Sequence, residues 1–329
     1  MRPTLLRLGD RGDAVRDLQD RLRLSGLAAE ADGEFGADTE ASVRSFQEVR
    51  GLRIDGICGP ETWGALVESS FCLGDRLLYH RQPMLRGDDV AAVQQRLNGL
   101  GFDSGREDGI LGPETEDALR RFQRDAGIAT DGVCGPATVA ALTRLGSLAA
   151  GSVASVREGE SFRRDSRRLD ERGLFLVVDP GLAALGDAVA RGLREIGAVV
   201  ALDATGQDAG LLAGEANRFG ADVFLSLGSG EPGARCAYFA TQQFRSEAGY
   251  AIAVRLTSAL GQVIETVDEP VGRAYRILRE TSMAAVAVEL FSPERPEAAA
   301  AISRRSPAIA AAIVDGIRRG VEEPIDVGR

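Results

Sequence analysis

Residues 174–188 read LFLVVDPGLAALGDA, and this stretch decides the fold of the C-terminal half of the chain. The apolar run 174–178 leads directly into Asp-Pro-Gly at 179–181, a pattern typical of a buried strand that ends in a tight turn. In open α/β sheets, such turns lie at the carboxyl ends of strands, where ligands and catalytic groups gather. The next four residues, 182–185, carry only alkyl side chains. The sequence therefore predicts the turn of an active site without the side chains for chemistry.

Short apolar runs alternate with helical patterns throughout the region around this stretch. Such alternation is typical of a three-layer α/β fold, in which a sheet lies between two layers of helices. The expected strands are 174–178, 199–202, 223–227, 236–240 and 285–289, and the expected helices lie near 184–196, 207–219, 246–261 and 307–320.

The N-terminal part of the chain contains an internal repeat. Residues 32–66 align without gaps to residues 108–142, and the upstream segments 12–27 and 87–102 also match. Each unit has apolar residues at helical spacing and predicts three helices, the third starting at a proline. The residues expected to face the core are Val15, Leu18, Leu22, Val43, Phe46 and Leu66 in the first unit, and Val90, Val93, Leu97, Leu119, Phe122 and Leu142 in the second.

The whole chain is therefore expected to be multidomain, α and α/β. Two small three-helix domains, 1–70 and 71–146, precede a linker at 147–172 and a three-layer α/β domain at 173–329. The linker is rich in small, polar and charged residues without sustained periodicity, and we expect it to end in a short helix.

Composition excludes several classes of protein. The net charge of −10 argues against a nucleic-acid partner, and no apolar run approaches the roughly 20 residues of a membrane span. The first residues lack the apolar core of a signal peptide, so we expect a cytoplasmic protein. Its cysteines are expected to be reduced, with no CxxC pair to hold structural zinc and with Cys58 and Cys134 as small core residues.

The repeated motifs resemble the peptidoglycan-binding domain found beside many bacterial wall hydrolases. The family pattern is a helical LQ-x-x-L, then DG-x-x-G-x-x-T-x-x-A-x-x-x-FQ, then a second DG-x-x-G-x-x-T. Most of these positions build turns and core, so the match indicates the fold more specifically than the ligand. The resemblance gives as candidate ligand-binding residues Asp55, Gly56, Gly59 and Thr62 in the first repeat, and Asp131, Gly132, Gly135 and Thr138 in the second.

Three landmarks in the C-terminal domain resemble the zinc-dependent N-acetylmuramoyl-L-alanine amidases of type 3. They are LVVDPGL at 176–182, EANRFGADVFLSLGSG at 215–230, and YRILRETSMAAVAVELF at 275–291. The family patterns are an apolar strand before DPGH, AN-x-x-x-AD-x-F-x-S-x-H-x-N, and LR-x-T-x-x-PA-x-L-x-E-x-GF. Their order along the chain matches, so the resemblance implies the amidase fold for nearly all of 173–322.

The same resemblance implies that the zinc site has been lost. The family holds zinc with two histidines and a glutamate, and a further glutamate acts as general base. Leu182 and Gly228 stand at the two histidine positions, and 182–192 contains no glutamate. Only the general-base position persists, as Glu289, which we expect to be a relic. We therefore expect no metal and no cofactor.

Three further positions bear on this site. Asp179 is expected to form hydrogen bonds within its own turn. His80 is the only histidine and precedes the second repeat, so we do not expect it to replace the missing ligands. We also expect a filled pocket that leaves no room for a side chain at Gly228.

The combination of repeats, amidase-like domain and missing signal peptide resembles a group of actinobacterial cytoplasmic proteins. That resemblance implies a non-catalytic regulator of peptidoglycan precursor synthesis that acts through protein contacts. Its implied partners are the enolpyruvyl transferase that starts the pathway, the lipid-precursor flippase and a Ser/Thr kinase. No serine, threonine or tyrosine follows Ser306, so the candidate phosphorylation sites are Ser152, Ser155 and Ser161 in the linker.

Two alternatives stay open at this stage. The chain could be a wall amidase with an unconventional site, which would require a bound metal. It could also be a passive binder of muropeptides or precursors, which would need no protein partner. Fold resemblance alone favours a hydrolase, but function must be argued from the site.

Overall fold

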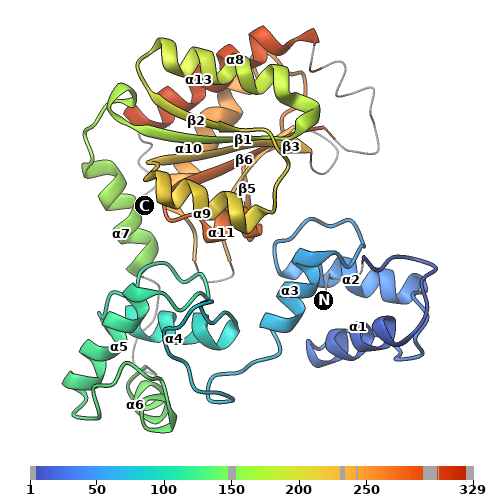
Figure 1. Cartoon of the computed structure of the whole chain (residues 1–329), viewed down its shortest axis with the longest axis vertical. Coiled ribbons are helices and arrows are strands. Elements are labelled where there is room, and N and C mark those ends of the chain that lie inside the picture. The colour runs from blue at the N-terminus through green and yellow to red at the C-terminus, as the bar shows by residue number, and fades with distance from the viewer. Residues whose placement is uncertain are drawn as a thin grey trace. The chain divides into compact units, whose positions relative to one another are not determined.

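The computed structural model describes residues 5–146, 153–229, 234–241, 244–291, 302 and 304–323. The chain divides into two compact units, one of Met1–Arg157 with Gln242–Phe244 and one of Glu158–Thr241 with Arg245–Arg329. Over the residues described, the first unit is helical and the second contains a mixed sheet with helices on both faces (Figure 1). The predicted fold class, two small helical domains before a three-layer α/β domain, is confirmed.

Three helices form each repeat, as predicted. The first repeat contains α1 (Asp13–Leu24), α2 (Ala37–Val49) and α3 (Pro60–Glu68), and the second contains α4 (Asp88–Gly99), α5 (Pro113–Asp125) and α6 (Pro136–Gly146). The helices α3, α5 and α6 begin at prolines, because the first helical turn needs no amide hydrogen and the fixed φ of proline already suits a helix.

Each repeat packs around its own hydrophobic core. All twelve residues that the helical spacing places inward are buried, none more than 2% exposed. Cys58 and Cys134 are fully buried free thiols, and burial raises the pKa of each thiol to about 12. Each thiol lies within the hydrophobic core of its repeat, which confirms that both are core residues.

The second unit alternates strands and helices around one sheet. Its elements in chain order are α7 (Val153–Arg164), which begins in the first unit, η1 (Leu169–Glu171), β1 (Gly173–Val178), η2 (Pro180–Leu182), α8 (Ala183–Glu195), β2 (Val199–Asp203), α9 (Ala209–Phe219), β3 (Val223–Ser229), β4 (Arg235–Phe239), α10 (Glu247–Leu260), β5 (Val271–Arg273), α11 (Arg276–Glu280), β6 (Ala284–Phe291) and α13 (Ser306–Glu322).

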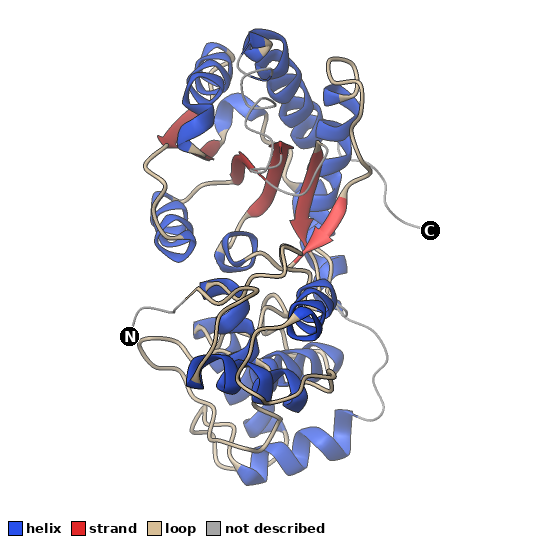
Figure 2. Ribbon diagram, turned by 90° about the vertical axis from the view of Figure 1, so that its right-hand side faces the viewer, coloured by secondary structure: helices blue, strands red, loops and turns tan. Residues whose placement is uncertain are grey.

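The six described strands form one sheet in the order β2-β1-β3-β6-β4-β5. All neighbouring pairs are parallel except β4 and β6, which run antiparallel. The carboxyl ends of β1, β3 and β6 therefore lie at one edge of the sheet, where the Asp-Pro-Gly turn also lies. Figure 2 shows the strands with helices on either side.

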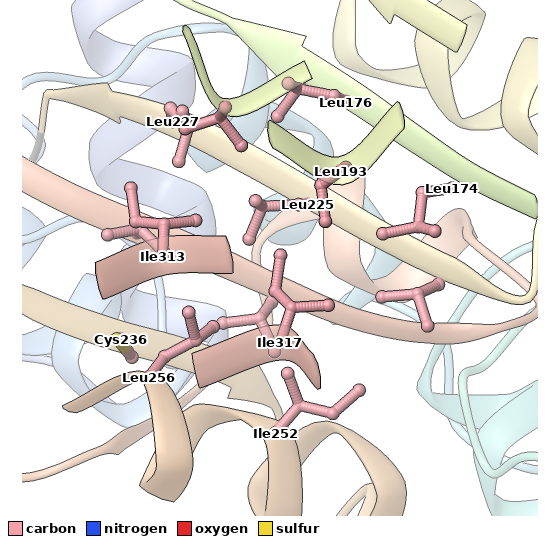
Figure 3. Close-up of a cluster of buried hydrophobic side chains, with 14 of the residues drawn as sticks. Leu174, Leu176, Leu193, Leu225, Leu227, Cys236, Ile252, Leu256, Ile313 and Ile317 are labelled. Carbon is pink, nitrogen blue, oxygen red and sulfur yellow. The ribbon is translucent and has the colours of Figure 1, made fainter. Parts of the chain in front are cut away.

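The main core lies between one face of this sheet and α8, α10 and α13. Alternate residues of the central strands, such as Leu225 and Leu227, point into it and meet Ile313 and Ile317 from α13 (Figure 3). The other face carries α9 and α11, where Phe175 stacks on Phe224 with ring centroids 6.2 Å apart. Burial on both faces explains why these strands read as continuous apolar runs.

All five predicted strands and all four predicted helices of this domain are present within a few residues of their expected limits. Two elements were not predicted, the strand β5 and the helix α11. β5 has three half-buried residues, and α11 has only five residues. Neither is long enough to show a period of two or of 3.6 residues.

The predicted linker at 147–172 contains the helix α7, which ends at Arg164, and the short helix at its end is η1. From Glu158 onward, its residues pack with the second unit. The Glu158 carboxylate accepts hydrogen bonds from the Ser246 hydroxyl at 3.0 Å and the Glu247 amide at 2.9 Å, and so caps α10. Among the candidate phosphorylation sites, Ser161 is exposed on α7, whereas Ser152 and the side chain of Ser155 lie outside the described residues. The domain limits themselves stay predictions.

None of the helices described is both long and apolar enough to cross a membrane.

Shortening one core side chain should separate core packing from surface effects. We expect Leu225→Ala to lower the free energy of unfolding by roughly 2–5 kcal/mol, because Leu225 is 1% exposed and its removal leaves a cavity. The matched control is Leu211→Ala, since Leu211 is 60% exposed and its loss should change stability by no more than about 0.5 kcal/mol. Urea denaturation followed by circular dichroism measures both, and equal effects would contradict this core.

Candidate functional site

A buried glutamine organises each Asp-Gly turn of the repeats. In the first repeat, the Gln47 side-chain amide donates to Asp55 Oδ1 at 2.8 Å, to the Ile57 carbonyl at 3.0 Å and to Thr62 Oγ1 at 3.0 Å. Its carbonyl oxygen accepts from the Gly56 amide at 2.9 Å. We call this set the glutamine clamp. It ties the helix that carries the glutamine to the following turn and to the first turn of the next helix.

The glutamine clamp occurs four times, twice in each repeat. In each case a buried glutamine bonds an aspartate, a glycine amide, a backbone carbonyl and a threonine. The other three clamps are Gln19 with Asp32, Gly33 and Thr39; Gln94 with Asp108, Gly109 and Thr115; and Gln123 with Asp131, Gly132 and Thr138. Most of the Gln, Asp, Gly and Thr residues in the sequence motif of the repeats thus form these hydrogen bonds.

The candidate ligand-binding residues of the repeats all help to form the turns or the helix starts. Asp131 accepts a bond from the Val133 amide, and that bond together with the Gln123 amide holds the pKa of Asp131 below its ordinary value. Gly56 and Gly132 have φ of 74° and 76°, which favours glycine. The remaining members are Asp55, Thr62 and Thr138 in the clamps, and Gly59 and Gly135 directly before α3 and α6. Their role toward a ligand stays a prediction.

The single histidine belongs to the second repeat. His80 Nδ1 lies 3.1 Å from Glu116 Oε2, and the other carboxylate oxygen of Glu116 accepts from Arg120 at 2.9 Å. The Arg120 guanidinium is the main reason that the pKa of Glu116 is lowered, with His80 adding to it. His80 is thus already bonded within its own repeat.

In the amidase-like domain, three residues stand in a row across three neighbouring strands. Glu289 on β6 pairs with Gly228 on β3 on one side and with Arg235 on β4 on the other. Paired residues on adjacent strands point to the same face of a sheet. Because Val288 faces the core under α8, α10 and α13, this row points to the opposite face, toward α9 and α11. We call these three residues the Glu289 row.

The Glu289 carboxylate is buried and lies against Tyr275 and Arg235. The residue is 5% exposed, and its Oε1 accepts a hydrogen bond of 2.6 Å from the hydroxyl of Tyr275, which precedes α11. Its Oε2 lies 3.8 Å from Nε of Arg235. Burial first, and then the negative charge of Glu289, raise the pKa of Tyr275 far above its ordinary value, so its phenol stays protonated and remains a donor.

The Asp-Pro-Gly turn is held by its own backbone. Asp179 Oδ1 accepts from the Gly181 amide at 2.9 Å, and the Leu182 amide donates to the Asp179 carbonyl at 2.7 Å. The interpretation of Asp179 as a turn-forming side chain is therefore confirmed. Leu182 is 1% exposed and packs in the core with Val178 and Leu185. The alkyl side chain after the turn thus extends the hydrophobic core.

The expectation that Gly228 lacks room for a side chain does not hold for a Cβ atom. Among the residues that the structure describes, a Cβ atom at Gly228 would have one neighbour within 4 Å, Cβ of Asp179 at 4.0 Å, which is an ordinary van der Waals distance. The reason is the alternation of the sheet. The apolar packing that takes up Leu182 fills the face under α8, whereas Gly228 belongs to the opposite face.

This donor set does not fit a catalytic zinc ion. Zinc needs three nitrogen, sulfur or oxygen ligands from the protein, and Leu182 and Gly228 provide none. Glu289 alone has a suitable atom, and it is engaged with Tyr275 and Arg235. Within the part of the chain that the structure describes, no three His, Cys, Asp or Glu side chains form a group that could hold a metal.

Arg235 and Tyr275 also belong to this site, although no pattern in the sequence predicted them. Arg235 stands one residue before the predicted strand 236–240, so no spacing rule marked it. Tyr275 opens the third amidase landmark, but the family pattern assigns no role to its first position. The available signal was the antiparallel pairing of β4 with β6, which brings Arg235 beside Glu289 and cannot be read from local periodicity.

Comparison with known proteins agrees with this division of the chain. Residues 11–66 and 86–142 match the family described as a putative peptidoglycan binding domain. The chain is 40% identical over 189 residues to N-acetylmuramoyl-L-alanine amidase CwlM of Mycobacterium tuberculosis, covering 54% of this chain and 46% of that protein. It is 32% identical over 165 residues to N-acetylmuramoyl-L-alanine amidase CwlL of Bacillus licheniformis, covering 43% and 46%. The chain thus spans about half the length of these relatives.

Among solved structures, the chain is similar to the N-acetylmuramoyl-L-alanine amidase from Clostridium difficile 630. The match has 16% identity and a TM-score of 0.37, and it covers 44% of this chain and 95% of that structure.

Removing one glutamine clamp should destabilise its repeat. We expect Gln94→Ala to lower the free energy of unfolding by about 2–4 kcal/mol, because it leaves the buried Gly109 amide and the Thr115 hydroxyl without this partner. The matched control is Gln95→Ala, one residue further along α4, where the side chain is half-buried and outside the clamp. Thermal and urea unfolding measure the difference, and a Gln94→Ala variant as stable as Gln95→Ala would contradict the structural role of the clamp.

Proposed function

We propose that this chain regulates peptidoglycan precursor synthesis and does not hydrolyse the wall. The premise is that it is a CwlM-type protein with two peptidoglycan-binding repeats before an amidase-like domain. The observation that carries the proposal is the state of the amidase-like site. Leu182 is part of the hydrophobic core, Gly228 has no side chain, and Glu289 is bonded to Tyr275.

The chemistry of amide hydrolysis supports this reading. A catalytic zinc ion normally has three protein ligands and an open position for water. Zinc binding is worth on the order of 10 kcal/mol even in simple sites, and one carboxylate cannot recover that. A general base must also receive a proton from the attacking water. Oε1 of Glu289 already accepts a 2.6 Å hydrogen bond, and Oε2 faces a guanidinium group.

In this proposal the amidase-like domain works as a folded surface for protein partners in the cytoplasm. The partners we propose are the enolpyruvyl transferase that starts precursor synthesis and the flippase that moves the lipid precursor. A Ser/Thr kinase would control the contact, and Ser161 on α7 is an exposed candidate for its action.

A second candidate function is passive binding of muropeptides or precursors by the repeats. The match of both repeats to a putative peptidoglycan binding domain favours it. It differs from the first candidate because it requires no protein partner. Under this alternative, the amidase-like domain only stabilises or positions the repeats.

The first test of the proposal is direct. We expect the purified protein to hold no stoichiometric zinc and to release no peptide from peptidoglycan, since Leu182 and Gly228 offer no metal ligand. Elemental analysis measures the metal, and chromatography of digested peptidoglycan measures the activity, with a zinc amidase as positive control. One zinc per chain together with chelator-sensitive hydrolysis would show that the protein is an enzyme.

A second test asks whether the former general base still matters. We expect Glu289→Gln to leave biological function nearly intact, because the amide oxygen can still accept the Tyr275 hydrogen bond. Complementation of a strain that lacks the protein measures this, and circular dichroism confirms that the variant folds. A folded variant that fails to complement would mean that the pocket retains an activity.

The partner itself is the third test, and it separates the two candidate functions. We expect affinity purification from native cytoplasm to recover the enolpyruvyl transferase, and the purified chain to change the rate of that enzyme. The Glu289→Gln variant should behave in the same way. Recovery of muropeptides without a protein partner, and no effect on the transferase, would favour the passive binder.

A further inference from the structure

The Glu289 row contains a positive charge at the edge of the sheet where the resembled enzymes hold a metal. Arg235 is the direct antiparallel partner of Glu289, and the two side chains are only 14% and 6% exposed. Nε of Arg235 lies 3.8 Å from Oε2 of Glu289. A carboxylate this deeply buried needs an opposite charge or strong donors nearby, because an isolated buried charge is costly.

The position of Arg235 is fixed by a second ion pair. Its Nη2 atom lies 2.9 Å from Oδ2 of Asp268, and the Asp268 amide donates to the carbonyl of Ala234 at 2.8 Å. Asp268 is 44% exposed, so solvent screens this outer pair. The guanidinium therefore bridges an outer carboxylate and the buried carboxylate of Glu289.

A second guanidinium group, that of Arg273 on β5, lies close to the Tyr275 hydroxyl and counteracts the rise in the pKa of that phenol. Tyr275 donates a neutral hydroxyl. Cys236, next to Arg235 in sequence, is a buried thiol whose pKa is raised to about 12, chiefly by burial, and it stays neutral. Arg235 is the cation that the strand register places directly beside Glu289.

We propose that Arg235 takes the place of the metal ion, supplying from within the chain the positive charge beside Glu289 and thereby keeping divalent cations from this edge of the sheet. The inference deepens the proposed function and rests on it, because it assumes that the native chain binds no zinc. It adds that missing ligands are only part of the barrier to metal binding. A fixed guanidinium group also repels any cation that approaches Glu289.

Zinc titration of full-length variants tests the proposal. Gly228→His adds an imidazole beside Glu289, where a Cβ atom has room. We expect Gly228→His/Arg235→Met to bind zinc at least about tenfold more tightly than Gly228→His in calorimetric titration, because the repelling charge is gone. The gain should disappear when Glu289→Gln is added to the pair.

A matched control removes an equal charge elsewhere. Arg318 on α13 pairs with Asp315 at 2.8 Å and with Glu322 at 3.7 Å. Gly228→His/Arg318→Met should bind zinc no better than Gly228→His. Equal zinc affinities for Gly228→His with and without Arg235 would overturn the proposal.

Thermal unfolding provides a measurement that does not depend on the added histidine. We expect Arg235→Met to lower Tm in the native chain, and to lower it much less in a Glu289→Gln background, where no buried charge needs a partner. An equal decrease in both backgrounds would also overturn the proposal, since it would give Arg235 a role in packing alone.

These outcomes distinguish the inference from the proposed function. One zinc ion per native chain would refute the non-catalytic function directly. Equal affinities in the variants would refute only the role of Arg235 and would leave the proposed function standing.

Discussion

A carboxylate buried at the end of β6 needs partners, and the arrangement of the amidase-like site follows from that requirement. Without metal ligands at positions 182 and 228, the charge of Glu289 is met by the Tyr275 hydroxyl and the Arg235 guanidinium. These contacts join β6 to β4 and to the start of α11. They hold in place the edge of the sheet where the carboxyl ends of β1, β3 and β6 lie.

The same requirement shapes the repeats and the segment after them. Each repeat buries two glutamines, and each glutamine amide satisfies a turn that would otherwise leave polar groups without partners. The buried Arg172, before β1, donates to the Asp165 carboxylate and to the carbonyl oxygens of Asp165 and Arg167. Motifs built from such groups report how a chain folds more directly than what it binds.

The fold could be predicted from the sequence largely because apolar residues repeat regularly. Buried strands such as 174–178 and 223–227 are continuous apolar runs. In the repeats, residues such as Leu18 and Phe122 belong to series of apolar residues at helical spacing. β5 and α11 were missed because elements of three and five residues carry no period. The site was harder to predict, since it depends on which strands become neighbours. Motif resemblance located Glu289 and Gly228, but the cross-strand position of Arg235 and the space beside Gly228 follow only from the sheet register.

The burial of Leu182 limits which substitutions the domain can tolerate at this position. A fully buried leucine contributes roughly 1.5–3 kcal/mol, a large share of the 5–15 kcal/mol by which domains are stable. Any mutation that places a polar side chain at position 182 is therefore expected to destabilise the domain. This loss of stability would disfavour such a mutation when substitutions arise one at a time. The packing of this single side chain thus makes a change from an apolar to a polar residue at position 182 more costly than the reverse change.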